Sequence, residues 1–248
     1  NTTLAEVTSG NMGIALANVA KTYGNKIIIY MPKNMSEERK KMITDLGAKL
    51  VLVNDFNEGF RLAENNKDVY YLRQFENPYN PDSYIAMCQE LETKIKDFPA
   101  FIAGVGTGGT LVGVGRYLKK KYQTKIVAIE PNESLLLSTG VDHGSHEIQG
   151  LSDGFIPKIY QPQLVDRIIS IGSEDSIMMA RKLNQTFKLT VGISSGANFL
   201  GAVLSKITGA ITVFPDSSDR YYSTRLFKGE IKSSLVDMIK LEKIELIK

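Results

Sequence analysis

The 248-residue sequence has few of the residues on which self-contained catalytic and metal sites depend. It contains one cysteine, Cys88, two histidines, His143 and His146, and no tryptophan. A single cysteine cannot form an internal disulfide and supplies no metal cluster, so we expect no structural metal site. The 30 basic and 27 acidic residues are mixed along the chain, and the net charge of +3 provides no basic stripe that would bind nucleic acid.

Long hydrophobic runs are absent as well. No apolar run approaches the roughly 20 residues of a membrane-spanning helix, and residues 1–4 lack the charged-then-apolar layout of a signal peptide. We therefore expect a cytoplasmic protein that does not bind membranes. The sequence does not begin with methionine and reaches its first motif at Thr8, without room for the strand and helix that should support it. We expect a further segment upstream.

What the chain does contain is an alternation of short apolar runs with helical patterns. Strands are expected at 26–31, 49–53, 69–72, 100–103, 125–130, 167–171 and 210–214, and helices at 11–23, 36–46, 57–66, 82–96, 110–122, 173–184 and 195–207. This alternation predicts the α/β class with parallel sheets and crossover helices. The densest turn pattern, at 77–81, predicts a junction between a smaller domain, 1–78, and a larger one, 79–248.

Two further segments carry expectations of their own. Residues 131–165 are irregular and too long for a simple connector, and loops of that length inside a compact domain are usually functional. Helical segments are expected after Arg220, and the last 18 residues, rich in lysine and isoleucine, predict an amphipathic terminal helix.

Three segments rich in glycine, serine and threonine stand directly before expected helices. In the first, residues 8–13 (Thr-Ser-Gly-Asn-Met-Gly), the helix start would present free backbone N–H groups and the positive end of the helix dipole, which suits a carboxylate or phosphate. The alternative is a plain helix cap formed by the hydroxyl side chains.

The second segment, residues 104–110 (Gly-Val-Gly-Thr-Gly-Gly-Thr), follows an expected strand. Its glycines and threonines let the backbone wrap an anion closely, as a phosphate cradle requires. The dinucleotide and Walker patterns do not fit, because the glycine spacing differs and no Lys-Ser or Lys-Thr follows. A tight turn without a ligand is the alternative.

In the third segment, residues 192–197 (Gly-Ile-Ser-Ser-Gly-Ala), a serine hydroxyl can point into a crevice at the carboxyl edge of a sheet. A nucleophile elbow is disfavoured, because the G-x-S-x-G spacing is absent and neither His143 nor His146 has a clear acidic partner. The alternative is that the serines only cap the helix.

Together these segments resemble the cysteine synthase (O-acetylserine sulfhydrylase) family of pyridoxal-phosphate enzymes, which have fold type II, the fold of the tryptophan synthase β chain. The resemblance runs from about residue 4 to residue 224. It also rests on the segments 31–36, 74–78, 146–150, 154–157 and 220–224. The resemblance implies two domains, each a mostly parallel sheet flanked by helices, an active site in the cleft between them, a homodimer, and pyridoxal 5′-phosphate as the cofactor.

The resemblance also implies roles for individual residues. Thr8, Ser9 and Asn11 would lie on a loop that closes over the substrate carboxylate, with Asn11 also contacting the 3′ oxygen of the cofactor, and Gln74 would reach the same carboxylate. The family's next threonine is replaced by Met12, which removes one hydroxyl donor and bears on substrate affinity or choice. The cofactor phosphate would lie against Gly106, Thr107, Gly108, Gly109 and Thr110.

Ser194 matches the family's serine that hydrogen-bonds the pyridine nitrogen. A neutral hydroxyl does not hold that nitrogen protonated, so the cofactor is a weaker electron sink, which favours direct β-elimination over transamination. The family's Schiff-base lysine lies upstream of the Thr8 loop, whereas the first lysine here, Lys21, is already inside the following helix. We therefore expect the catalytic lysine in a preceding segment. The alternative is a non-catalytic homologue that lost it.

The most informative departure from the family is Asp153, in the segment Gly-Leu-Ser-Asp-Gly-Phe at 150–155, where ordinary sulfhydrylases carry small, uncharged residues. One interpretation is a solvated loop acid, because desolvating an unpaired carboxylate is costly. The other is a general base that activates water, or another incoming nucleophile, for addition to an aminoacrylate. A carboxylate would also repel hydrosulfide as a nucleophile.

The sequence thus predicts a lyase or transferase of amino-acid metabolism. It would convert L-cysteine through an aminoacrylate into hydrogen sulfide and, by addition of water assisted by Asp153, L-serine. One alternative is an O-acetylserine sulfhydrylase that makes L-cysteine, and another is the non-catalytic homologue. A generic nucleotide-binding protein is a weaker option, because no acidic ribose partner follows the glycine loop at the expected distance.

Overall fold

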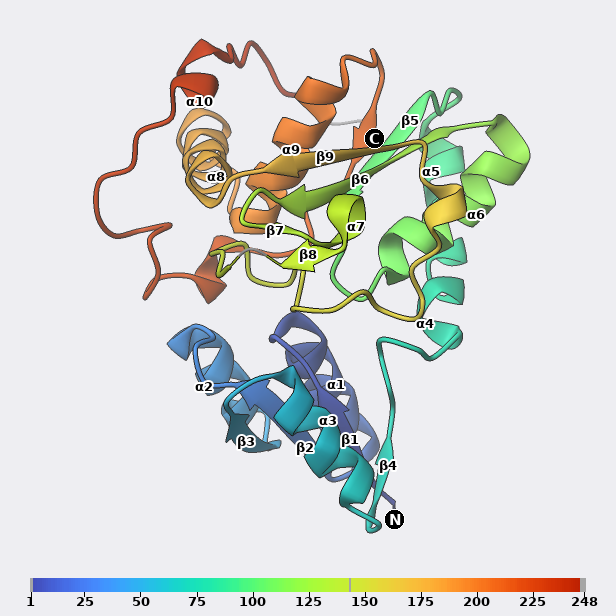
Figure 1. Cartoon of the computed structure of the whole chain (residues 1–248), viewed down its shortest axis with the longest axis vertical. Helices are drawn as coiled ribbons and strands as arrows, with labels where there is room; N and C mark the ends of the chain where they lie inside the picture. The colour runs from blue at the N-terminus through green and yellow to red at the C-terminus, as the bar shows by residue number, and fades with distance from the viewer. Residues whose placement is uncertain (1, 143, 246–248) are drawn as a thin grey trace.

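The computed structural model describes residues 2–142 and 144–245, which form two lobes (Figure 1). The first lobe, blue to teal in Figure 1, holds a parallel four-stranded sheet in the order β3-β2-β1-β4. Its strands are β1 (Thr3–Val7), β2 (Ile27–Pro32), β3 (Lys49–Val53) and β4 (Val69–Tyr71), joined by the helices α1 (Asn11–Tyr23), α2 (Glu37–Asp45) and α3 (Phe56–Asn65).

The second lobe holds another parallel sheet, in the order β10-β5-β6-β9. Its strands are β5 (Ala100–Gly104), β6 (Lys125–Pro131), β9 (Arg167–Ile171) and β10 (Ile211–Thr212). Its longer helices are α5 (Ile85–Lys94), α6 (Gly109–Tyr122), α8 (Ser173–Phe187) and α9 (Ile193–Ser205). Shorter elements are α4 (Tyr79–Asp82), β7 (Ser134–Leu135), α7 (Leu136–Thr139), β8 (Val141–Asp142), η1 (Pro162–Leu164), η2 (Ser218–Arg220) and α10 (Ser234–Met238).

The apolar runs became strands because helices cover both faces of each sheet. The residues of β5 and β6 are almost all buried, as expected for parallel strands with no solvent-facing side. Each lobe has its own buried clusters, with α3 and α1 on opposite sides of the first sheet and α9 and α6 on opposite sides of the second. The predicted α/β class is confirmed. The predicted boundary at 78/79 separates the two sheets and stays a prediction.

Most predicted elements form close to their expected bounds, but the expectation that no strand fits before Thr8 was wrong. Residues 3–7 have room for a strand after all: β1 lies inside the first sheet, paired with β2 and β4. The helix expected at 82–96 forms as the shorter α5, and α4 precedes it over the predicted turn. Among the described residues of the irregular stretch 131–165, the short elements β7, α7, β8 and η1 form.

The expected terminal helices were also largely wrong. After Arg220, α10 is the one α-helix in the described residues, and residues 239–245 are not helical. Side chains of α8 explain this, because they take backbone carbonyls that a helix would use. Lys182 Nζ donates to the carbonyls of Val236 and Ile239 at 2.8 and 2.6 Å, and Arg181 donates to carbonyls between residues 225 and 229.

Two classes of site find no support in the described residues. No helix there has the length and apolar character needed to cross a membrane. No group of three or more His, Cys, Asp and Glu side chains in the same ranges is arranged to hold a metal ion.

Candidate active site

A cavity of about 180 Å³ lies where the two lobes meet. Its walls include the segments that follow β1 and β5, because the carboxyl ends of parallel strands are where loops gather into a crevice. Every residue to which the sequence assigned a role lines this cavity: Thr8, Ser9, Asn11, Gln74, Gly106, Thr107, Gly108, Gly109, Thr110, Asp153 and Ser194. Met12 lines it too. The structure therefore brings the predicted site residues together, whereas their individual roles stay predictions.

Three helices begin at this cavity, and each has a glycine at its N-cap position. The N-cap residues of α1, α6 and α9 are Gly10, Gly108 and Gly192, and none makes a side-chain capping hydrogen bond. The hydroxyls of Thr8 and Thr107 accept from the N–H groups of Gly10 and Gly109 at 3.1 and 3.2 Å, so threonines satisfy one donor at each of two helix starts. Uncapped helix starts that face one cavity favour an anionic ligand.

The glycine segment at 106–110 has the geometry of an anion cradle. The backbone N–H groups of Gly106, Thr107 and Gly108 have no hydrogen-bond partner among the residues that the structure describes. A Cβ on Gly106 would lie 2.2 Å from the carbonyl oxygen of Gly150, and Gly108 has a φ of 85°. Only glycine satisfies both the close approach and the left-handed conformation. The loop thus presents donors without side chains in front of them.

Unpartnered polar atoms of other residues also lie at the cavity. Asn11 Nδ2 donates to Asp216 Oδ2 at 2.9 Å, while Asn11 Oδ1 is buried with no partner within the described ranges. Ser194 is buried, and its hydroxyl makes no hydrogen bond in the same ranges. Buried polar atoms are usually satisfied, so this pattern is typical of a site that holds a ligand.

Gln74 is held in place by Glu6, a residue that the sequence reasoning missed. The backbone N–H of Gln74 donates to Glu6 Oε2 at 3.0 Å, and its side-chain amide donates to the carbonyl of Val7 at 2.5 Å. Burial raises the pKa of Glu6 to about 8, although N–H donors from Val7 and Gln74 oppose that shift. An acidic residue inside the apolar strand β1 was the available sequence clue.

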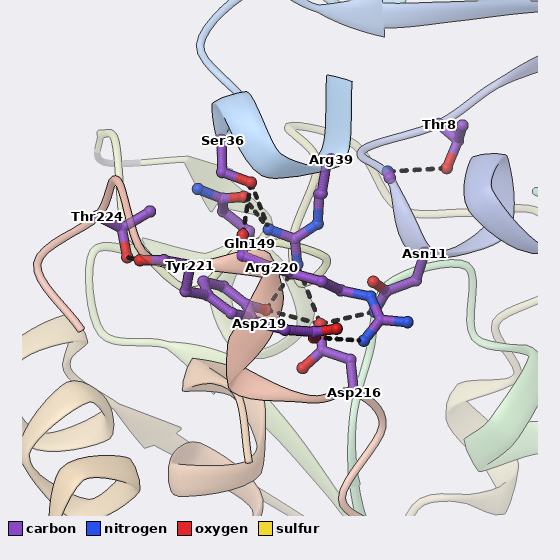
Figure 2. A network of polar contacts seen from close by, with 11 residues as sticks. Thr8, Asn11, Ser36, Arg39, Gln149, Asp216, Asp219, Arg220, Tyr221 and Thr224 are labelled. Atoms are coloured by element: carbon purple, nitrogen blue, oxygen red, sulfur yellow. Dashed lines mark hydrogen bonds and ion pairs between the residues drawn. The ribbon is translucent and has the colours of Figure 1, made fainter. Parts of the chain in front are cut away.

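Arg39 is a second residue that sequence reasoning missed. It lies in α2 and has none of the roles predicted above, but it is almost fully buried and lines the cavity. Its guanidinium forms an ion pair with Asp216 at 3.0 Å, and both side chains are at most 2% exposed. It also donates to the Tyr221 hydroxyl at 2.6 Å and to Gln149, and it lies 4.3 Å above the Tyr221 ring (Figure 2).

This network joins the two lobes. Arg39 comes from α2 in the first lobe, while Asp216 and Tyr221 come from the second, as Figure 2 shows. It also explains why Ser36, the N-cap residue of α2, does not cap that helix with its side chain: its hydroxyl donates to the carbonyl of Arg220 at 2.7 Å instead. Asp216 accepts from Arg39, Tyr221 and Asn11 together, which ties the network to the cavity.

Asp153 is half-buried at the cavity wall. Its carboxyl makes no hydrogen bond or ion pair with any residue that the structure describes, and desolvation raises its pKa to about 7. A carboxyl with a pKa of about 7 can exchange a proton near neutral pH.

His146 does not form a Ser-His pair with Ser194, because its Nε2 lies 3.1 Å from the carbonyl oxygen of Ser152. His143 lies outside the described residues.

Comparisons with known proteins now give the family. The family described as "Pyridoxal-phosphate dependent enzyme" matches residues 1–215. Cysteine synthase from Staphylococcus aureus is 40% identical over 242 residues, covering 91% of this chain and 77% of that protein. The chain belongs to the pyridoxal-phosphate-dependent enzymes of the cysteine synthase family. The predicted family and cofactor are thereby confirmed, and a generic nucleotide-binding protein is not supported.

Solved structures of this family agree with the fold. The hydrogen sulfide-producing enzyme from Fusobacterium nucleatum has a TM-score of 0.90 and 38% identity, covering 99% of this chain and 79% of that chain. Cysteine synthase from Entamoeba histolytica has a TM-score of 0.85 and 32% identity, and the match covers 95% of this chain and 74% of that chain. The two-domain arrangement of fold type II is therefore confirmed for this pyridoxal-phosphate enzyme.

The residues at the cavity fit the family's cofactor. The free N–H groups and uncapped start of α6 would hold its phosphate, and the Ser194 hydroxyl is free to meet a ring nitrogen. Bound pyridoxal phosphate withdraws electrons from the substrate's α-carbon. The chain's own part is to hold and orient the reactants.

Replacing Gly106 with alanine is expected to remove the bound cofactor, because the new Cβ would meet the backbone oxygen of Gly150 at 2.2 Å. Gly115→Ala, in α6, is the matched control, since the atoms nearest its new Cβ would be those of the Ile126 side chain, at an ordinary contact distance of 3.4 Å or more. The visible absorbance of the full-length protein after gel filtration measures how much cofactor it retains. Full retention by Gly106→Ala would contradict the cradle assignment.

Proposed function

We propose that this enzyme converts L-cysteine and water into L-serine and hydrogen sulfide. The observation that supports this proposal most strongly is the unpartnered, half-buried Asp153 carboxyl at the cavity wall, with a pKa of about 7. In the same proposal Thr8, Ser9 and Gln74 hold the substrate carboxylate, and Asn11 and Ser194 contact the cofactor. We also infer a cytoplasmic homodimer.

The reaction consists of an elimination and an addition. In the elimination, the α-carbon of cysteine loses its proton and the C–S bond breaks, so that hydrosulfide leaves, takes up a proton as hydrogen sulfide, and an α-aminoacrylate remains. In the addition, the oxygen of water bonds to the β-carbon, Asp153 accepts a proton from that water, and a proton returns to the α-carbon. A neighbour supports this scheme: an aspartate variant of a hydrogen sulfide-producing enzyme, with a TM-score of 0.91, was solved with the α-aminoacrylate intermediate.

The pH dependence of the addition provides a test. Because the carboxylate form of Asp153 is the base, the rate of addition should rise as the pH rises through about 7 and level off above it. If Asp153 had the ordinary pKa of about 4, the rate of addition would not rise further above about pH 5. Single-turnover decay of the aminoacrylate absorbance measures this step apart from ionisation of the cysteine thiol. A flat profile across neutral pH would contradict a base with this pKa.

A second candidate function is O-acetylserine sulfhydrylation, which the cysteine synthase relatives favour. Side-by-side turnover separates the two. The full-length enzyme is given L-cysteine alone in one reaction and O-acetylserine with sulfide in another. We expect faster turnover of cysteine, because the Asp153 carboxylate repels hydrosulfide but can activate water. Rapid cysteine synthesis with negligible release of sulfide from cysteine would favour the alternative.

A further inference from the structure

Two backbone positions next to the cavity are unusual in the same way. Five residues other than glycine have a positive φ in the described ranges: Arg73, Gln123, Ser152, Lys188 and Lys206. Three of these, Gln123, Lys188 and Lys206, are the residues at which α6, α8 and α9 end, where a left-handed residue is ordinary. The other two directly precede residues that line the cavity.

These two are Arg73, at a φ of 58°, and Ser152, at a φ of 47°. Arg73 is followed by Gln74 and Ser152 by Asp153, both of which the sequence assigned to the active site. Left-handed backbone is unfavourable for residues with a Cβ and persists only where surrounding contacts enforce it, and such positions cluster at functional sites. The contacts around Ser152 therefore show how Asp153 is placed.

Ser152 is held by contacts from three separate parts of the chain. Its N–H donates to the carbonyl of Val105 at 3.0 Å. Its hydroxyl lies 2.7 Å from the hydroxyl of the buried Ser134, and its carbonyl oxygen lies 3.1 Å from Nε2 of His146. All of the backbone and side-chain polar groups of Ser152 are thus engaged, so its conformation is over-determined.

Asp153 depends on this arrangement because nothing else orients its carboxyl. Within the described ranges no cation or N–H group contacts that carboxyl. The nearby glycines, Gly150 and Gly154, have φ values of 94° and 89°, which glycine adopts without the strain that a Cβ imposes at Ser152. The direction of the Asp153 side chain is therefore set by the backbone at Ser152.

We propose that Ser152, fixed by Ser134 and His146, is a positioning residue that aims Asp153 at the β-carbon of the bound intermediate. This inference rests on the proposed function and extends it to the partition of the aminoacrylate. Correct aim leads to addition of water at the β-carbon and to serine. Otherwise the aminoacrylate is released, its C–N bond is hydrolysed by water, and pyruvate and ammonia are the products. Each route consumes one water molecule and requires no oxidant or reductant.

The test uses the cofactor-loaded, full-length enzyme with L-cysteine, and it compares Ser152→Ala and Ser134→Ala with the wild type. Sulfide, serine and pyruvate are measured together. Misdirecting a reacting group by a fraction of an ångström commonly costs an order of magnitude or more, so the ratio of serine to sulfide should fall about ten-fold in both variants, with pyruvate making up the difference. The aminoacrylate absorbance should also persist longer.

Two comparisons make the test specific. Because the two hydroxyls contact each other, the double variant should lose no more than either single variant. Ser145→Ala, which changes an exposed serine of the same segment, should keep the wild-type product ratio. Unfolding temperature and cofactor absorbance report whether each variant folds, and Ser134→Ala alone carries the test if Ser152→Ala does not fold.

The outcomes separate the two proposals. A wild-type enzyme that makes serine, with an unchanged serine-to-sulfide ratio in both variants, contradicts the positioning role alone. A wild-type enzyme that makes no serine from cysteine contradicts the proposed function and the inference with it. A matched fall in both variants, absent from Ser145→Ala, supports the positioning role.

Discussion

Replacing Asp153 with asparagine is expected to slow serine formation from L-cysteine by about 10²- to 10⁴-fold. Asparagine keeps the shape of the side chain but cannot accept the proton of the attacking water. Sulfide release in the first turnover should continue, because the elimination does not use Asp153. The full-length variant should therefore accumulate aminoacrylate absorbance after cysteine is added, as rapid-mixing spectroscopy would show.

A matched control is Asp142→Asn, which changes an exposed acid of β8 that does not line the cavity. It should leave both the serine yield and the absorbance trace as in the wild type. If Asp153→Asn instead forms serine at the wild-type rate, Asp153 is not the base, and the solvated-acid interpretation of the sequence is the better one.

Replacing Arg39 with methionine is expected to destabilise the protein by about 3–5 kcal/mol. The loss would leave Asp216 as a buried charge without its cation. The Oδ1 atom of the same carboxylate already lacks a partner among the described residues. For a chain of this size that corresponds to a fall in unfolding temperature of about 6–20 °C. Thermal unfolding followed by circular dichroism, supported by denaturant titration, measures it.

Two further variants show whether the effect comes from the buried charge. Arg116→Met removes an exposed ion pair with Asp82, at 3.7 Å, and should cost at most about 1 kcal/mol. Adding Asp216→Asn to Arg39→Met should recover part of the lost stability, because no uncompensated charge is then buried. An Arg39→Met variant as stable as the wild type would show that the network in Figure 2 does not hold the lobes together.

The local part of the fold was predictable because the sequence carries its physical cause. Strands such as β5 and β6 read as short apolar runs since both faces of a parallel sheet are buried. The helix expected at 11–23 ends where predicted, at the left-handed Gly24. The terminal helix was not predictable in this way. Its propensity was overridden by Lys182, a residue more than fifty positions earlier, which takes the carbonyls of Val236 and Ile239.

The members of the candidate site were predictable for a related reason. Motifs that follow strands of parallel sheets end at the same edge, so Thr8 and Gly106 meet although about a hundred residues separate them. Arg39 and Glu6 were missed because burial of a charge depends on partners far away in the chain, such as Asp216. The left-handed backbone of Ser152 likewise arises from contacts with Ser134 and His146 that no local pattern reveals.

In the proposed reaction, water is the nucleophile that adds to the β-carbon. The most direct measurement incubates the full-length enzyme with L-cysteine in water labelled with the heavy oxygen isotope and analyses the amino-acid product by mass spectrometry. The proposed reaction gives serine with the label in its β-hydroxyl group, formed in equal amount to the released sulfide. Unlabelled serine, or release of sulfide without any serine, would contradict it.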